Sequence, residues 1–195
     1  MKQLLVTCFE PFGGETTNAS AQAAALLPEQ IGAWTLVRQE LPVVFGLAGE
    51  KCCARIDELR PDAVLMLGQA AGREAVTPEL AARNVRWARI PDNAGRSPLG
   101  ESVVPGGEDA LFATLPVETM TEAIRATGLP AALSATAGLY VCNDLYYTVL
   151  HHLRGTGTPA AFVHVPSAET LSPEQSARAL EAAITAIDGE KGTVE

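Results

Sequence analysis

The chain has 195 residues, 47% of them hydrophobic and 19% charged, and its formal net charge is −9. This length and composition predict one folded domain over residues 1–195 with a sizeable core, and they exclude a disordered chain. The acidic balance, without any cluster of Lys and Arg, argues against a nucleic-acid or anionic-membrane surface, and no apolar run approaches the ~20 residues of a membrane span.

The N-terminal residues and the cysteines indicate the cellular compartment in which the protein resides. The opening residues, MKQLLVTCFE, form an apolar run that is too short and too soon interrupted by Glu10 for a signal peptide. Cys8, Cys52, Cys53 and Cys142 lack the spacing of a zinc site, and two adjacent cysteines do not suit a regular disulfide framework. We therefore expect a cytoplasmic protein with reduced thiols that are free for chemistry.

Hydrophobic patterns and capping residues predict the elements of the first part of the chain. In chain order they are a buried strand over 3–7, a helix over 19–27 capped by Asn18, a strand over 34–43, a helix over 45–59 and a buried strand over 62–68. A further strand is expected over 84–90, followed by a loop over 91–107.

The second part continues the alternation of strands and helices. We expect helices over 108–116 and 117–128, a strand over 131–138, a helix over 143–153, a strand over 159–166 and a helix over 173–188 capped by Ser172. This order predicts an α/β fold, a single-domain three-layer α/β/α sandwich around a mostly parallel twisted sheet. In such sheets, sites gather beyond the carboxyl ends of the strands.

Cys142 lies where an apolar run meets the start of a helix, in GLYVCNDLYYTVLHH. Exposed N–H groups and the helix dipole stabilise a thiolate there, so Cys142 is either a nucleophile or a small buried hydrophobe. A cysteine nucleophile most often uses histidine as its base, and the chain has three histidines. His151 and His152 lie further along the same helix, roughly 13–15 Å away along its axis, which is too far for contact.

His164 ends the strand that follows this helix. If the strands leading into Cys142 and His164 are parallel neighbours, ~4.8 Å apart, the thiol and the imidazole meet at the edge of the sheet. The competing interpretation is structural, because cysteines and histidines in strands are more often core residues. Cys8 is a rival nucleophile after a strand, whereas Cys52 and Cys53 are expected to pack rather than react.

Seven fragments carry a family resemblance. They are VTCFEPFGG (6–14), LGQAAGR (67–73), VTPELAARN (76–84), ARIPDN (88–93), TLP (114–116), SATAGLYVCN (134–143) and FVHVP (162–166). In this collinear order they resemble the pyrrolidone carboxyl peptidases (pyroglutamyl peptidase type I), cysteine peptidases that remove an N-terminal pyroglutamyl residue. The resemblance implies a cysteine exopeptidase that acts on peptides with N-terminal pyroglutamate. It also implies that no metal or organic cofactor is needed and that the protein is a homo-oligomer, often a tetramer.

The resemblance also implies the catalytic residues. Cys142 corresponds to the nucleophile, His164 to the base and Glu79 to the carboxylate that orients and stabilises the imidazolium. Spacing alone does not select Glu79, for which a solvated loop carboxylate is the competing interpretation. The resemblance implies that Arg89 is a cationic group that stabilises the oxyanion, in addition to the backbone N–H of Cys142. An ion pair between Arg89 and a loop acid is the alternative.

Pyroglutamate presents an uncharged five-membered lactam, which calls for an apolar slot with a few polar groups that pair its N–H and C=O. A free N-terminal ammonium entering such a slot loses hydration without gaining a counter-charge. Phe9 and Phe12 are candidates to sandwich the ring. The complete set of candidate substrate-binding residues is Phe9, Phe12, Gln69, Ile90, Tyr140 and Val141.

Two residues depart from the family pattern. Cys8 stands where the family usually has Gly, and Tyr140 stands where it usually has Phe and adds a hydroxyl that needs a partner.

One alternative function is that of a phosphorylase-like α/β enzyme that uses Gly-rich loops on a phosphorylated ligand. However, neither G-x-x-x-x-G-K-[ST] nor G-x-G-x-x-G after a strand is present. The other alternative is a non-catalytic relative that binds pyroglutamyl groups.

Overall fold

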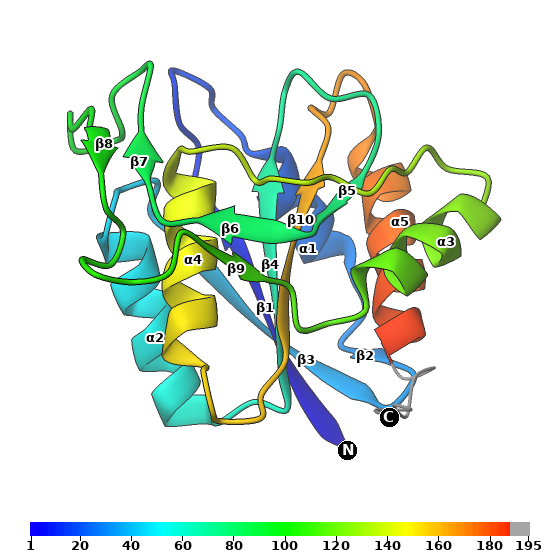
Figure 1. Ribbon diagram of the computed structural model, residues 1–195. Helices are drawn as coiled ribbons and strands as arrows, with labels where there is room; N and C mark the ends of the chain where they lie inside the picture. Colours follow the sequence, from blue (N-terminus) through cyan, green and yellow to red (C-terminus); the bar gives the residue numbers. More distant parts are fainter. Residues whose placement is uncertain (188–195) are drawn as a thin grey trace.

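Six strands form the central sheet of the computed structural model, which describes residues 1–187 (Figure 1). Their order is β2 (Gln30–Ile31), β3 (Trp34–Leu41), β1 (Lys2–Phe9), β4 (Ala63–Gln69), β10 (Ala160–Val165) and β5 (Thr77–Glu79). The four central strands are parallel to one another, and the two outer strands, β2 and β5, are antiparallel to their neighbours. The sheet is therefore mostly parallel, as predicted.

Helices cover both faces of this sheet and complete the three-layer sandwich (Figure 1). One face carries α1 (Ala19–Leu26), α3 (Val117–Ala126) and α5 (Pro173–Ala186), and the other carries α2 (Leu47–Leu59) and α4 (Val141–His152). Two small antiparallel pairs lie outside the main sheet, namely β6 (Ala81–Arg83) with β9 (Ala110–Phe112) and β7 (Arg86–Trp87) with β8 (Leu99–Glu101). Across residues 1–187, the longest apolar helical stretch falls short of what crossing a membrane requires.

β1 shows why the strands of the central sheet are continuous apolar runs in the sequence. Successive side chains of a strand point to opposite faces, and helices cover both faces here, so every second residue enters a different core. Leu4 and Cys8 pack toward α1, α3 and α5, whereas Leu5 and Phe9 pack toward α2 and α4. The predicted α/β sandwich is thus confirmed, and it places Phe9 and Cys8 on opposite sides of the sheet.

Capping side chains begin two of the helices as the sequence predicts. The Asn18 side chain accepts a hydrogen bond from the backbone N–H of Ser20 at the start of α1. Ser172 and Gln175 form a reciprocal capping box at the start of α5. α5 ends at Ala186, and the last position of the predicted helix, residue 188, lies outside the described residues.

The strands predicted over 3–7, 34–43, 62–68 and 159–166 and the helices predicted over 19–27, 45–59, 117–128 and 143–153 are present, with ends shifted by a few residues. The helix predicted over 108–116 is wrong, because Leu111 is buried beside an exposed Phe112 and this alternation forms strand β9. Of the strand predicted over 84–90 only β7 forms, and the loop predicted over 91–107 contains β8.

The strand predicted over 131–138 is also wrong. Its backbone makes only two isolated bridges, from Ala131 to Val76 and from Ser134 to Glu79. The hydroxyl of Ser134 bonds to the carbonyl of Thr136, and the hydroxyl of Thr136 accepts from the N–H of Gly138. Such local side-chain bonds compete with a regular ladder, so the chain approaches α4 as an irregular segment.

Candidate active site

The carboxyl edge of the sheet brings Cys142 close to the end of β10. In the parallel pairing of β4 with β10, His164 stands beside Gly68. Cys142 occupies the first turn of α4, and a Cβ placed on Gly68 would lie 3.0 Å from its Sγ. The thiol therefore rests against Gly68, next to His164 in the sheet. The packing of α4 on the sheet, and not a pair of parallel strands as predicted, brings the two residues to one cavity.

Glu79 is the hydrogen-bond partner of His164. The antiparallel pairing of β5 with β10 sets Glu79 opposite Phe162 and Thr77 opposite His164. His164 Nδ1 lies 2.7 Å from Glu79 Oε1, and both side chains are buried. When the carboxylate accepts from Nδ1–H, the neutral ring keeps its acceptor electron pair at Nε2. The site thus contains an oriented imidazole that can take a proton.

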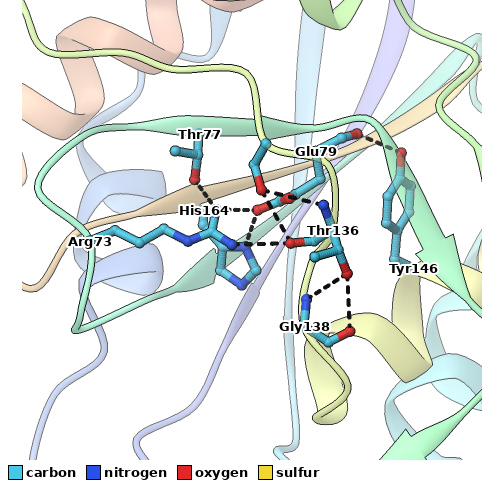
Figure 2. Close-up of polar contacts among 8 residues, drawn as sticks. Arg73, Thr77, Glu79, Thr136, Gly138, Tyr146 and His164 are labelled. Carbon is cyan, nitrogen blue, oxygen red and sulfur yellow. Dashed lines mark hydrogen bonds and ion pairs between the residues drawn. The ribbon is translucent and has the colours of Figure 1, made fainter.

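Arg73 forms an ion pair with Glu79 that the sequence did not reveal. Figure 2 shows Arg73 and His164 converging on Glu79, with Thr77 bonded to Arg73. Arg73 also donates to the hydroxyl of Thr77 and, over 3.2 Å, to the carbonyl of Thr136. LGQAAGR includes this arginine, but the spacing along the chain does not indicate which acid it pairs with.

Burial sets the resting protonation of the thiol and the imidazole. Burial lowers the pKa of His164 below its ordinary value, against the opposing effect of the hydrogen bond to Glu79. Burial, aided by the charge of Glu79, raises the pKa of the Cys142 thiol to about 12. Arg73 and the backbone N–H of Cys142 act the other way and are outweighed. Both shifts favour the neutral forms of the thiol and the imidazole.

A cavity of about 120 Å³ opens onto Cys142 and His164. It is mostly apolar and includes five of the predicted substrate-binding residues, Phe9, Phe12, Gln69, Tyr140 and Val141. Sequence reasoning missed the other three lining residues, Asn18, Val43 and Ala137. The lining residues, all within the described part of the chain, include neither Lys nor Arg, so the cavity suits a small uncharged group better than a phosphate.

Polar side chains at the cavity fix its walls. Gln69 Oε1 accepts from the N–H of Ala19 over 2.6 Å, and Asn18 Nδ2 donates to the carbonyl of Glu10 over 3.0 Å. The hydroxyl of Tyr140 donates to the carbonyl of Pro91 over 3.0 Å, which supplies the partner that the sequence left unnamed. These bonds tie the start of α1 and the segment before α4 to the site.

Arg89 and Ile90 lie outside this cavity. Both are exposed, and they line a neighbouring hollow of about 620 Å³ together with Trp87, Gly138, Leu139 and Tyr140. Ile90 thus lines the neighbouring hollow rather than the cavity, and its role in substrate binding stays a prediction. Arg89 makes no ion pair or hydrogen bond with any residue of 1–187, so the predicted alternative, pairing with a loop acid, is not observed.

The remaining thiols are packed away from the cavity. Cys8 lies on the opposite face of the sheet from Phe9, and burial together with Glu40 raises its pKa to about 11. Cys52 is fully buried on α2, and burial raises the pKa of its neighbour Cys53 to about 11. The arrangement therefore favours Cys142 over the rival Cys8.

The two histidines of α4 make contacts elsewhere. His152 Nε2 lies 2.8 Å from Asp57 Oδ1 on α2. The ring of His151 stacks on that of Tyr147, with a centroid distance of 6.3 Å. Neither lines the cavity, which agrees with their predicted distance from Cys142. Among residues 1–187, no group of three or more His, Cys, Asp or Glu side chains is arranged to hold a metal ion.

The residues that follow the thiol anchor the start of α4. Asn143 accepts from the N–H of Arg83 over 2.7 Å and donates to the carbonyls of Arg83 and Val85. Asp144 pairs with Arg86 and accepts from the N–H of Gly46 over 2.6 Å. Both side chains are fully buried, so the helix start is held from two sides by bonds that need these residue types.

Comparison with known proteins extends over nearly the whole chain. A family model described as Pyroglutamyl peptidase matches residues 2–188. Pyrrolidone-carboxylate peptidase of Levilactobacillus brevis is 46% identical over 198 residues, which is 95% of this chain and 97% of the relative, and that of Thermococcus onnurineus is 42% identical over 95% of each. A crystal structure of pyroglutamyl peptidase I from Bacillus amyloliquefaciens has a TM-score of 0.92 at 34% identity, covering 97% and 98% of the two chains.

Proposed function

The chain belongs to the pyroglutamyl peptidase family, and on that premise we propose that Cys142, His164 and Glu79 remove the N-terminal pyroglutamyl group of peptides. The observation that carries this proposal is a buried Glu79–His164 pair beside a small apolar cavity that Cys142 also lines. The activity is that of a cysteine exopeptidase, and the assignment of the catalytic residues is ours.

The pyroglutamyl ring occupies the cavity between the walls that include Phe9, Phe12 and Tyr140. A five-membered lactam is uncharged and fits a space of this size. An ordinary N-terminus brings an ammonium group, and the lining provides no carboxylate to balance that charge. The ammonium would therefore lose its hydration without compensation, which gives selectivity for the blocked N-terminus.

The reaction begins with a proton transfer. Sγ of Cys142 attacks the pyroglutamyl carbonyl carbon while Nε2 of His164 takes the thiol proton, since burial favours the neutral thiol. Glu79 stabilises the imidazolium that forms. The imidazolium then gives this proton to the leaving nitrogen, the C–N bond breaks, and a thioester remains on Cys142. Water, deprotonated by His164, hydrolyses the thioester and releases pyroglutamate and the free thiol.

The start of α4 offers donors for the oxyanion. Tyr140 is the N-cap residue, and its side chain makes no capping hydrogen bond. The backbone N–H of Cys142 in the first turn therefore remains available to stabilise negative charge on the attacked oxygen. Arg89, which resemblance links to the oxyanion, lies in the neighbouring hollow, so we assign the main contribution to the backbone.

The test is release of a chromophore from a pyroglutamyl amide. We expect Cys142→Ser to lower kcat/KM by at least about a thousandfold, because the hydroxyl is a much weaker nucleophile at this site. Cys53→Ser is the matched control and should retain the activity, since Cys53 lies on α2 away from the cavity. Comparable activity of the Cys142→Ser variant and the wild type would contradict the proposal.

Three further proposals rest on the family membership and the sequence. We propose that residues 1–195 form a single peptidase domain, that the protein is a homo-oligomer, with a tetramer as the expected form, and that it resides in the cytoplasm. All four cysteines are free, in keeping with a reducing compartment. Light scattering on the purified protein measures the oligomeric state directly.

A further inference from the structure

The cavity at Cys142 has room for the pyroglutamyl ring but not for the residue that follows it. At about 120 Å³ it is far smaller than the neighbouring hollow of about 620 Å³. We call the latter the leaving-side hollow and define it by its six lining residues, Trp87, Arg89, Ile90, Gly138, Leu139 and Tyr140. Under the proposed function, the rest of the peptide must leave the cavity beside Cys142 and lie on the surface near it.

One continuous segment of chain borders both spaces. Leu139 lines the leaving-side hollow, Tyr140 lines both spaces, and Val141 and Cys142 line the cavity. Leu139 is three residues from the thiol, so the two lie within about 11 Å along the chain. A peptide anchored by its first residue at Cys142 can therefore reach the hollow with its second residue.

The leaving-side hollow is held in shape by two hydrogen bonds across it. The N–H of Trp87 donates to the carbonyl of Leu139 over 2.9 Å, and the hydroxyl of Tyr140 donates to the carbonyl of Pro91 over 3.0 Å. Tyr140 is further supported by an edge-on contact with Phe45, at a centroid distance of 5.3 Å. The walls on both sides are thus fixed before any peptide binds, which lowers the entropic cost of binding.

The lining determines which side chains fit. Trp87 and Ile90 are about half exposed, at 51% and 48%, and large apolar side chains that are so exposed are stabilised when an apolar ligand covers them. Arg89 is the charged member of the lining, and its positive charge disfavours a Lys or Arg side chain in the same space.

We infer that the leaving-side hollow binds the side chain of the residue that follows pyroglutamate, with preference for apolar and aromatic residues and against basic ones. This inference rests on the proposed function. It adds a specificity site, centred on Trp87, to the ring-binding cavity.

The experiment compares kcat/KM for four peptides that differ only after pyroglutamate, where they carry Phe, Leu, Ala or Lys. We expect the wild type to favour Phe and Leu over Ala by about tenfold, and Ala over Lys. Trp87→Ala should bring the Phe-to-Ala ratio close to one while the Ala peptide is still cleaved. Phe112→Ala is the matched control, since Phe112 is 66% exposed on β9 and belongs to a different hollow.

Two outcomes would overturn the inference. If Trp87→Ala lowers kcat/KM equally for all four peptides, or leaves the Phe-to-Ala ratio of kcat/KM unchanged, the hollow does not select the leaving residue. If the circular dichroism of Trp87→Ala shows loss of fold, Ile90→Ala replaces it, with the same expected fall in the ratio. Failure of the wild type to cleave any of the four peptides would instead overturn the proposed function.

Discussion

At the scale of single residues, charge around His164 is balanced between Glu79 and Arg73. The hydrogen bond and charge of Glu79 raise the pKa of the imidazole, whereas the charge of Arg73 and, above all, burial lower it. Arg73 also pairs with Glu79 directly, so one carboxylate is shared between a guanidinium and an imidazole. Arg73 therefore contacts the site at Glu79 and opposes the effect of that carboxylate on the imidazole.

The pH dependence of kcat/KM tests this balance. Only the neutral imidazole can take the thiol proton, so activity rises as pH increases through the His164 pKa, and its midpoint should lie below the ordinary value of about 6.5. Glu79→Gln removes the group that raises this pKa and should move the midpoint down, with a loss of kcat of about 10²- to 10⁴-fold. Arg73→Gln should move the midpoint up.

The opposite directions of the two shifts are the control, because a general structural defect would not separate them. Shifts of equal sign in Glu79→Gln and Arg73→Gln, or a wild-type midpoint above 6.5, would contradict this balance of burial and charge around His164. The measurement is a pH profile with the pyroglutamyl amide substrate.

At the scale of elements, the site depends on how closely α4 packs against β4. Gly68 has no side chain, and an added Cβ would come within 2.8 Å of the Phe162 ring and 3.0 Å of the Cys142 Sγ. The Phe162 ring contacts those of Tyr146 and His164, at centroid distances of 5.7 and 4.7 Å, so it has little freedom to retreat. The missing side chain of Gly68 thus allows the thiol to stand next to His164.

Gly68→Ala should therefore displace the thiol and lower kcat/KM, by up to about a hundredfold for a shift near 1 Å. Gly72→Ala is the matched control from the same fragment of sequence, because an added Cβ there has nothing within 4 Å. A pyroglutamyl amide assay with both variants makes the comparison. Full activity of Gly68→Ala would mean that this close approach of α4 to β4 is not needed.

Local sequence patterns predicted some helices and strands correctly and others not. Strands buried on both faces, such as β4 and β10, and capped helices, such as α1 and α5, have strong local patterns and were predicted correctly. The segments over 108–116 and 131–138 were not, since β9 is only three residues long and the second segment is held by side-chain and tertiary bonds. Such structure depends on partners far away in the sequence.

At the scale of the whole molecule, the cavity gathers residues from the ends of β1, β4 and β10 and from the start of α4. The sequence paired Cys142 with His164 through a strand over 131–138 that does not form, and the position of α4 brings both residues to the cavity instead. Family resemblance alone pointed to Glu79, because β5 is too short to show a pattern. The pairing of Arg73 with Glu79 could be found only from the folded chain.

The most direct test of the central claim is to identify the residue that carries the acyl group. The enzyme is mixed with an activated pyroglutamyl ester, which speeds acylation, then quenched in acid and mapped by mass spectrometry. We predict one pyroglutamyl group in thioester linkage on the peptide that contains Cys142, and none in the Cys142→Ser variant. A pyroglutamyl group on Cys8 or Cys53, or turnover of the ester with Cys142 unmodified, would contradict the account.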